Sequence, residues 1–168
     1  MTAKRQSIIT LGFCLGMATS FGVGFLPMSG TMGSLVAVGL LYVLGPVKDL
    51  WLSGFCVLGL GLGVIVAGVA GKYFRVPDAS AIVIDEVVGM GMAMIGVPKT
   101  GYWLLWAFIL FRFFDIVKVP PADWVDAHLK NGWGVMLDDV IAAFYSNIIL
   151  HAMMASQLVS GKINEVVM

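Results

Sequence analysis

The amino-acid sequence predicts an all-α integral membrane protein, built as a compact bundle of about five to six transmembrane or re-entrant helices. Hydrophobic residues make up 60% of the 168 positions, charged residues make up only 12%, and the mean hydropathy is +0.96. A soluble domain is about 45–50% apolar and about 25% charged. The chain therefore falls in the membrane class, and its length predicts a single membrane-embedded domain over residues 1–168.

Five apolar segments are candidates for membrane crossings. A spanning helix needs about 20 apolar residues, or about 17 at the lower limit. Leu50–Ala70 meets this requirement with 21 uncharged residues. The other candidates are Leu35–Leu44, which is short, and three segments whose charges lie near one end: Ile82–Val97, Tyr102–Val119 and Val135–Gln157.

The first apolar segment, Ile8–Phe25, has two interpretations. Lys4 and Arg5 precede it and small residues follow Met17, which is the pattern of a secretory signal peptide. Its apolar character nevertheless continues to residue 25, and four glycines weaken it as a straight helix. We therefore expect the segment to be retained as a re-entrant or half-crossing element.

The order of the segments predicts that the polar stretches gather at one face of the bundle. If each of the five later segments crosses in turn, residues 27–34, 71–86 and 112–134 emerge on the same side, and only short links lie on the other. The Lys and Arg count then favours the polar face by seven to three if Ile8–Phe25 is re-entrant, and is five to five if it spans. The positive-inside rule therefore predicts a cytoplasmic location for that face.

Three groups of charged residues interrupt the apolar segments: Asp85-Glu86, Arg112 with Asp115, and Asp138-Asp139. A charge at such a position costs on the order of a few kcal/mol unless it is paired, hydrated or bound to a cation, so these residues are candidates for a functional site. Carboxylate oxygens are preferred ligands of Mg²⁺, which usually also bridges to a substrate phosphate. The five carboxylates therefore predict a divalent-cation site.

Each group also has a simpler structural interpretation. Acids in the first turn of a helix are favoured by the helix dipole, which could explain one acid of the first pair but not both. Arg112 and Asp115 are three residues apart and could form an ion pair on one helix face, or Arg112 could present its planar donors to phosphate. Asp138 and Asp139 would point about 100° apart on a helix, so both need not enter one site.

A glycine-rich motif, Gly30-Thr31-Met32-Gly33-Ser34, precedes the apolar segment Leu35–Leu44. Glycine permits a tight turn, and Thr31 or Ser34 would then cap the helix that follows. The free N–H groups at a helix N-terminus also suit an anion. Because the motif shares the predicted face of the carboxylates, Thr31, Gly33 and Ser34 are candidate phosphate-binding residues.

The remaining residues of chemical interest are given more limited roles. Lys118 follows Arg112 and would add a second positive charge before Pro120-Pro121 ends the helix. Cys14 and Cys56 are expected to be buried apolar side chains. His128, in a polar loop, and His151, in an apolar run, are expected to be structural or incidental. No basic patch with interleaved aromatic residues indicates nucleic-acid binding.

Taken in order along the chain, these motifs resemble the phosphatidylglycerophosphatase A family of small multi-pass membrane phosphatases. The matching pieces are Gly30-Thr31-Met32-Gly33-Ser34-Leu35, Asp78 with Ile82-Val83 and Asp85-Glu86, Phe111-Arg112 with Asp115 and Lys118, Pro121 and Asp126, and Gly132 with Gly134 and Met136-Leu137-Asp138-Asp139. Each piece is short, but their order and spacing together are specific.

The resemblance implies Mg²⁺-dependent hydrolysis of phosphatidylglycerophosphate to phosphatidylglycerol and phosphate, at the surface of a bacterial inner membrane. The implied catalytic residues are Asp85, Glu86, Asp115 and Asp139, and the implied metal ligands are the same four with Asp138. The implied substrate-binding residues are Thr31, Gly33, Ser34, Arg112 and Lys118. Mg²⁺ would polarise the phosphoryl group and activate water; no DxDxT-type signature indicates an aspartyl nucleophile, although attack by an Asp stays open.

The main alternative is a small membrane transporter or ion-coupled carrier that uses intramembrane carboxylates. A carrier predicts acids spread across the depth of the bilayer, whereas here every group lies near one predicted face. A lipid phosphotransferase of the CDP-alcohol type would need an Asp-Gly and a downstream Gly-x-x-x-Asp series, which this chain lacks. A structural protein would not need five carboxylates placed together.

Overall fold

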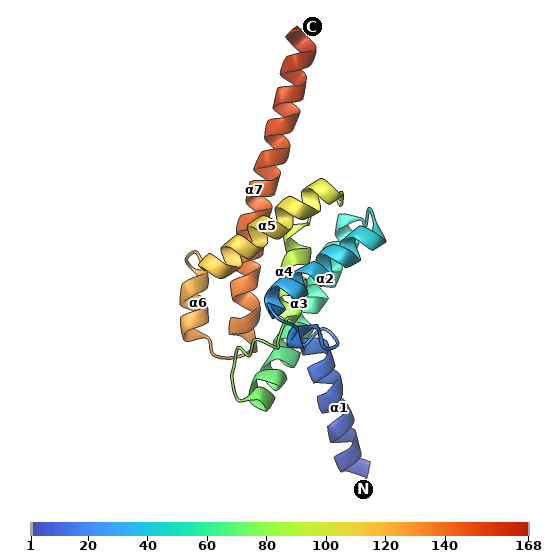
Figure 1. Cartoon of the computed structure of the whole chain (residues 1–168), viewed down its shortest axis with the longest axis vertical. Helices are drawn as coiled ribbons and strands as arrows, with labels where there is room; N and C mark the ends of the chain where they lie inside the picture. The colour runs from blue at the N-terminus through green and yellow to red at the C-terminus, as the bar shows by residue number, and fades with distance from the viewer. Residues whose placement is uncertain (1, 168) are drawn as a thin grey trace.

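The computed structural model describes residues 2–167, and their side chains over residues 8–157, as a bundle of helices (Figure 1). The helices are α1 Thr2–Ala18, the 3₁₀ helix η1 Val23–Phe25, α2 Ser29–Leu44, α3 Asp49–Phe74, α4 Ile84–Ala93, α5 Gly101–Val117, α6 Ala122–His128 and α7 Gly132–Val167. No strand occurs within residues 2–167. The prediction of an all-α fold is therefore confirmed.

Among the described residues, two helices are long and apolar enough to cross a bilayer. Helix α3 and the Gly132–Gln157 part of α7 each have 26 residues, which is about 39 Å at the α-helical rise against a hydrocarbon core of about 30 Å. Helix α2 and residues 8–18 of α1 are shorter apolar helices. Large apolar side chains such as Leu50, Phe55 and Ile65 lie exposed on α3. A protein with such a surface associates with a membrane.

Helix α4 is packed on several sides, against α2, α3, α5 and α7. It has only ten residues, which is about 15 Å, so the predicted crossing helix over Ile82–Val97 is wrong in length. The helix ends at Ala93 because the chain turns over residues 94–97, where Gly96 has a φ of +73° and Pro98 follows. The two acids of the predicted pair lie in its first turn.

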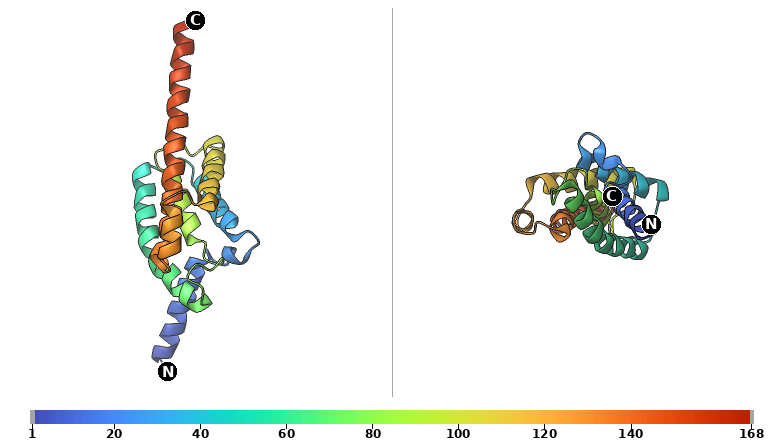
Figure 2. Two further views of the ribbon diagram at one scale, coloured as in Figure 1. Left: turned by 90° about the vertical axis from the view of Figure 1, so that its left-hand side faces the viewer. Right: turned by 90° about the horizontal axis from the view of Figure 1, so that it is seen from below.

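Helix α1 does not run the length of the bundle. The Val83 N–H donates a hydrogen bond to Ala18 O at 2.9 Å, and Gly24 lies directly against the backbone of Ala81. The chain therefore reverses beside the loop that leads into α4, and the start of α1 projects from that end of the molecule (Figure 1, Figure 2). This arrangement supports the half-crossing interpretation of the first apolar segment.

The two short links at the opposite end of the bundle meet each other. Asp49 at the start of α3 forms an ion pair with Lys99 and accepts a hydrogen bond of 3.1 Å from the Gly96 N–H. Asn147 of α7 donates hydrogen bonds to Ala93 O and Ile95 O at 3.0 and 2.7 Å. The polar stretches predicted to share one face lie toward the other end, which is called the site end below.

Three predictions about local structure at the site end are wrong. Helix α2 begins at Ser29, so the Gly30–Ser34 motif forms its first turns, and neither Thr31 nor Ser34 caps it, because the N-cap position is Met28. Its two glycines are accommodated in the helix because they face close neighbours, described below. Part of the predicted polar loop, including His128, forms α6.

Helix α7 begins at Gly132, earlier than the predicted start at Val135, because Asn131 supplies a cap. The Asn131 Oδ1 accepts hydrogen bonds from the N–H groups of Trp133 and Gly134 at 2.9 and 3.2 Å. Gly132 itself lies against the backbone of Val64 in α3, where a larger residue would not fit. The cap and this contact fix where α7 starts and therefore which of its residues reach the centre of the bundle.

Candidate metal and phosphate site

Three carboxylates converge inside the bundle: Asp85 and Glu86 from α4, and Asp139 from α7. One oxygen from each lies within 4.8 Å of the others. Asp85 Oδ1, Glu86 Oε2 and Asp139 Oδ2 are buried and lack a hydrogen-bond partner within the described side chains. Buried carboxylate oxygens are strongly unfavourable without compensation. We call these three residues the acid cluster, and their oxygen-only ligand set fits a hard divalent cation such as Mg²⁺.

Close packing of α4 brings the acid cluster together. Gly89 lies one turn after Asp85 on the same face of α4. A Cβ added to Gly89 would lie 2.8 Å from the Phe111 ring and 3.2 Å from the Cβ of Asp139. The glycine therefore allows α4 to approach α5 and α7 closely enough for their charged residues to meet.

Arg112 and Asp115 of α5 form an ion pair, one of the two interpretations of this spacing, next to the acid cluster. Arg112 Nη1 lies 2.5 Å from Asp115 Oδ2, and both side chains are largely buried. Arg112 Nε is also buried and has no hydrogen-bond partner within the described residues. Asp115 is at the same time an electrostatic neighbour of Glu86 and Asp139. It therefore links the guanidinium group to the acid cluster.

The first turn of α2 closes another side of the site. A Cβ added to Gly30 would collide with Glu86 Oε1 and would lie 3.0 and 3.1 Å from the terminal nitrogens of Arg112. One turn later, a Cβ on Gly33 would lie 2.9 Å from the Cβ of Val83. The N–H groups of a first helical turn have no intrahelical partners and favour an anion. Together with Arg112, they place hydrogen-bond donors beside the acid cluster.

The other two predicted phosphate-binding residues of the motif are less directly placed. The Ser34 side chain is buried, and its hydroxyl donates a hydrogen bond of 2.9 Å to Gly30 O within the same helix. Thr31 is partly exposed in the first turn of α2. Gly33 and Arg112 lie next to Glu86. Substrate binding stays a prediction for all four residues.

Lys118 belongs to a second charged group, which we call the ionic network. Its Nζ lies 3.0 Å from both Asp126 Oδ2 and Asp138 Oδ2. Burial lowers the pKa of Lys118, but hydrogen bonds to Asp138 and Asp126 outweigh this effect and raise its pKa, so the lysine stays protonated. Asp138 Oδ1 also accepts a hydrogen bond from the Asp139 N–H at 3.1 Å. Asp138 is thus directed to Lys118, and metal binding by Asp138 stays a prediction.

Sequence reasoning gave no role to two residues that the structure brings to these groups. Gly30 belongs to the recognised motif, but the contact with Glu86 and Arg112 depends on the crossing of α2 with α4 and α5. Asp126 is part of the family pattern, and it follows Lys118 across the two prolines. For the pair formed by Lys118 and Asp126, the only signal in the sequence is their opposite charge on either side of the two prolines.

The histidines contact backbone carbonyls, and the cysteines are buried, as predicted for the cysteines. His128 Nδ1 lies 2.8 Å from Trp124 O with the two rings stacked, and His151 Nε2 lies 3.2 Å from Ile95 O. Cys14 and Cys56 are buried free cysteines. None of the four lies in the acid cluster.

The model of a known family, described as phosphatidylglycerophosphatase A, matches residues 16–154 of the chain. The chain belongs to the phosphatidylglycerophosphatase A family. The resemblance seen in the motifs is therefore confirmed, and the chain is a member of a family of phosphoric monoester hydrolases. No solved structure matches this chain.

Several curated relatives cover most of the chain. A phosphatidylglycerophosphatase A of Haemophilus influenzae is 39% identical over 142 residues, which are 81% of this chain and 85% of the relative. A protein of the same name from Escherichia coli is 34% identical over 137 residues, 80% of each chain. A putative phosphatidylinositol-3-phosphatase of Bacteroides thetaiotaomicron is 36% identical over 142 residues, 80% of this chain and 89% of the relative.

Proposed function

We propose that the protein hydrolyses the terminal phosphate of phosphatidylglycerophosphate in an Mg²⁺-dependent reaction, giving phosphatidylglycerol and phosphate. The observation that carries the proposal is the acid cluster, whose three buried oxygens lack partners within the described residues, beside Arg112 and the first turn of α2. A cation site next to hydrogen-bond donors is an arrangement that suits a phosphate ester. A carrier would instead distribute its acids along a path through the membrane. The close grouping of Asp85, Glu86 and Asp139 does not favour a carrier.

Asp85, Glu86 and Asp139 would hold the cation through their unpartnered oxygens. When bound, Mg²⁺ supplies Lewis-acid polarisation of the phosphoryl group. Asp115 would contribute to both the cation site and the phosphate site, because it pairs with Arg112 and adjoins Asp139. Burial of the cluster also limits the access of bulk water, which strengthens each electrostatic interaction in the site.

Arg112 would bind the phosphate and neutralise charge that develops on it during transfer. Its Nε is buried without a partner, and charge-assisted hydrogen bonds from a guanidinium to phosphate are strong and directional. The first-turn N–H groups of α2, opened to the site by Gly30 and Gly33, would supply further donors. Lys118 would act mainly through Asp138, by holding α7 so that Asp139 faces the cluster.

The proposed location is the bacterial inner membrane, as a multi-pass protein with the site end at the cytoplasm. The polypeptide reverses direction after α1 at the site end and not at the far end. This supports counting Lys4 and Arg5 with the site end, which gives the seven-to-three distribution of positive residues. The site-end residues are Lys4, Arg5, Lys72, Arg75, Arg112, Lys118 and Lys130, against Lys48, Lys99 and Lys162. The positive-inside rule then puts the site on the cytoplasmic side.

The deciding experiment measures phosphate release by the purified protein in detergent micelles that contain phosphatidylglycerophosphate. We expect release with Mg²⁺ and none after chelation with EDTA, with recovery when excess Mg²⁺ is restored. Phosphate release that is unaffected by chelation would contradict the metal requirement. The absence of release under both conditions would contradict the proposed reaction.

The substrate needs a separate comparison, because one relative has a different name. That relative is called a putative phosphatidylinositol-3-phosphatase. Both lipids offer a phosphomonoester at the membrane surface, so kcat/KM should be measured for each under identical micelle conditions. We expect phosphatidylglycerophosphate to be preferred; a higher kcat/KM for phosphatidylinositol 3-phosphate would reassign the substrate while keeping the reaction class.

A further inference from the structure

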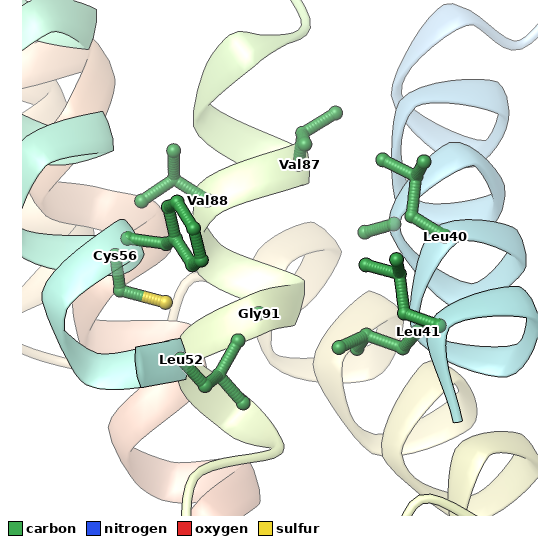
Figure 3. A pocket seen from close by; sticks show the side chains of 10 residues that line it. Leu40, Leu41, Leu52, Cys56, Val87, Val88 and Gly91 are labelled. Atoms are coloured by element: carbon green, nitrogen blue, oxygen red, sulfur yellow. The ribbon is translucent and has the colours of Figure 1, made fainter. Parts of the chain in front are cut away.

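An apolar cavity of about 280 Å³ lies between α2, α3 and α4 (Figure 3). Leu40 and Leu41 of α2 face Val87 and Gly91 of α4 across it, while Leu52 and Cys56 of α3 line a third side. No lining residue carries a charge or a polar group stronger than the Cys56 thiol. Leu40 is 52% exposed, so the cavity is open on the outer surface of the bundle and forms a groove.

Two walls of the groove lead directly out of the candidate site. On α4, Val87 follows Glu86 of the acid cluster, and Gly91 lies one turn further on. On α2, the face that presents Gly30 and Gly33 to the site continues at three- and four-residue spacing through the groove residues Ala37 and Leu41, as shared faces of a helix do. The groove therefore begins where the charged site ends.

The groove runs along the bundle toward the opposite end. Its far wall is formed by Leu44 and Leu52, which flank the link between α2 and α3. From Ala37 to Leu44 the rise along α2 is about 10 Å, a large part of the roughly 15 Å hydrocarbon thickness of one leaflet. An extended hydrocarbon chain that starts at the site would thus follow the groove in the direction that lipid chains take in a bilayer.

We propose that the groove binds one acyl chain of the phospholipid substrate, an inference that rests on the proposed function and deepens it. The acyl chain is already in lipid, so entering the groove removes little apolar surface from water. Binding is favoured instead by van der Waals contact with the groove, and it orients the lipid. A chain held between α2 and α4 would bring the attached headgroup phosphate to Arg112 and the first turn of α2. Long-chain substrates are therefore turned over more efficiently than short-chain ones.

The test fills the groove without disturbing the core. Leu40→Trp adds bulk at a half-exposed groove position, and Val43→Trp adds the same side chain on α2 at a position that is 83% exposed and outside the groove. kcat/KM is measured with dipalmitoyl and dihexanoyl phosphatidylglycerophosphate. We expect Leu40→Trp to lower the dipalmitoyl value about tenfold and the dihexanoyl value less than about twofold, with Val43→Trp changing neither.

Leu44→Trp, at the far end of the groove and 65% exposed, is the second variant if Leu40→Trp does not fold. An equal loss for both chain lengths, or the same loss in Val43→Trp, would overturn the proposal.

A labelling experiment separates failure of the groove from failure of the proposed reaction, because it needs no turnover. Phosphatidylglycerol with a diazirine in the middle of one acyl chain is irradiated with the protein in micelles. We expect crosslinks on groove residues of α2 and α4, with a decrease in Leu40→Trp but not in Val43→Trp. Labelling that is equal in the two variants would contradict the groove, even if the wild-type protein releases phosphate normally.

Discussion

The acid cluster and the ionic network contain carboxylates that are adjacent in sequence, yet they differ in how their charges are compensated. In the ionic network, Asp138 and Asp126 each lie 3.0 Å from Lys118. In the acid cluster, Asp85 and Asp139 each bury one oxygen that has no partner within the described residues. Charges paired in this way hold elements together, whereas unpaired buried carboxylates indicate a place for a cation.

The position of each group in the bundle agrees with this difference. The ionic network joins the end of α5 to α6 and to the start of α7, and Lys118 remains 29% exposed. The acid cluster lies between α4 and α7, with Asp139 only 3% exposed. Consecutive residues of α7, Asp138 and Asp139, therefore belong to two differently compensated groups, the ionic network and the acid cluster. The following variants test this contrast, from the largest expected effect to the smallest.

Replacing Asp139 with Asn should nearly abolish activity. The substitution removes one proposed cation ligand without changing side-chain size, and we expect kcat to fall by about 10²–10³. The stabilisation by Mg²⁺, about 2.7 kcal/mol at 100 times Kd, should also be lost. Phosphate release and thermal unfolding with and without Mg²⁺ measure these effects.

The matched control for Asp139→Asn is Asp138→Asn, the same change one residue earlier. It should keep both the Mg²⁺-dependent shift in Tm and most of the activity. If the two variants lost the Mg²⁺ response equally, the division between acid cluster and ionic network would be wrong.

Arg112→Lys should have the next largest effect. A lysine keeps the positive charge but cannot supply the forked donors of the guanidinium. The loss of one charge-assisted hydrogen bond corresponds to about 1.5–3 kcal/mol, or roughly 10- to 150-fold in kcat/KM. Steady-state kinetics with saturating Mg²⁺ measure this loss. A kcat/KM within threefold of the wild-type value would show that charge, and not donor geometry, is what the site uses.

Gly30→Ala tests the close approach of α2 to the site. The added methyl group would overlap Glu86 and crowd Arg112, and overpacking of this kind typically costs about 1–3 kcal/mol. We expect a loss of about tenfold in kcat/KM. Gly39→Ala on the same helix is the control, since its Cβ would meet no atom within 4 Å. That variant should be stabilised by about 0.5–1 kcal/mol with normal activity.

The smallest change in activity is expected for Asp126→Asn, which weakens the ionic network from its outer side. Lys118 keeps Asp138 as a partner, and the affected pair is partly exposed, so the loss of stability should be about 0.5–1 kcal/mol. Thermal unfolding should detect this loss while kcat changes less than about twofold. A large drop in kcat at unchanged Tm would instead indicate that Asp126 contacts the reacting groups.

Several features followed from local sequence patterns and are found in the structure. The three-residue spacing of Arg112 and Asp115 made an ion pair one of two interpretations, and the pair is found. The segment order predicted that the charged groups gather at one end, and Asp85, Glu86 and Asp139 do so. Helix boundaries were less predictable. The glycines at positions 30 and 33 suggested a turn, but they lie inside α2. At these two positions neighbouring residues leave no room for a side chain, which explains why glycine occurs within the helix.

The amino-acid sequence by itself determined the helical membrane class, the family and the set of charged residues, because hydropathy and the order of short motifs are properties of the chain. Only the tertiary structure decided which carboxylates bury an oxygen that has no hydrogen-bond partner within the described residues. Asp138 and Asp139 are chemically identical neighbours, and their directions differ because residues one apart on a helix point about 100° apart. The crossing of α4 with α7 directs Asp139 to Asp85, whereas Lys118 at the end of α5 lies between Asp126 of α6 and Asp138 of α7.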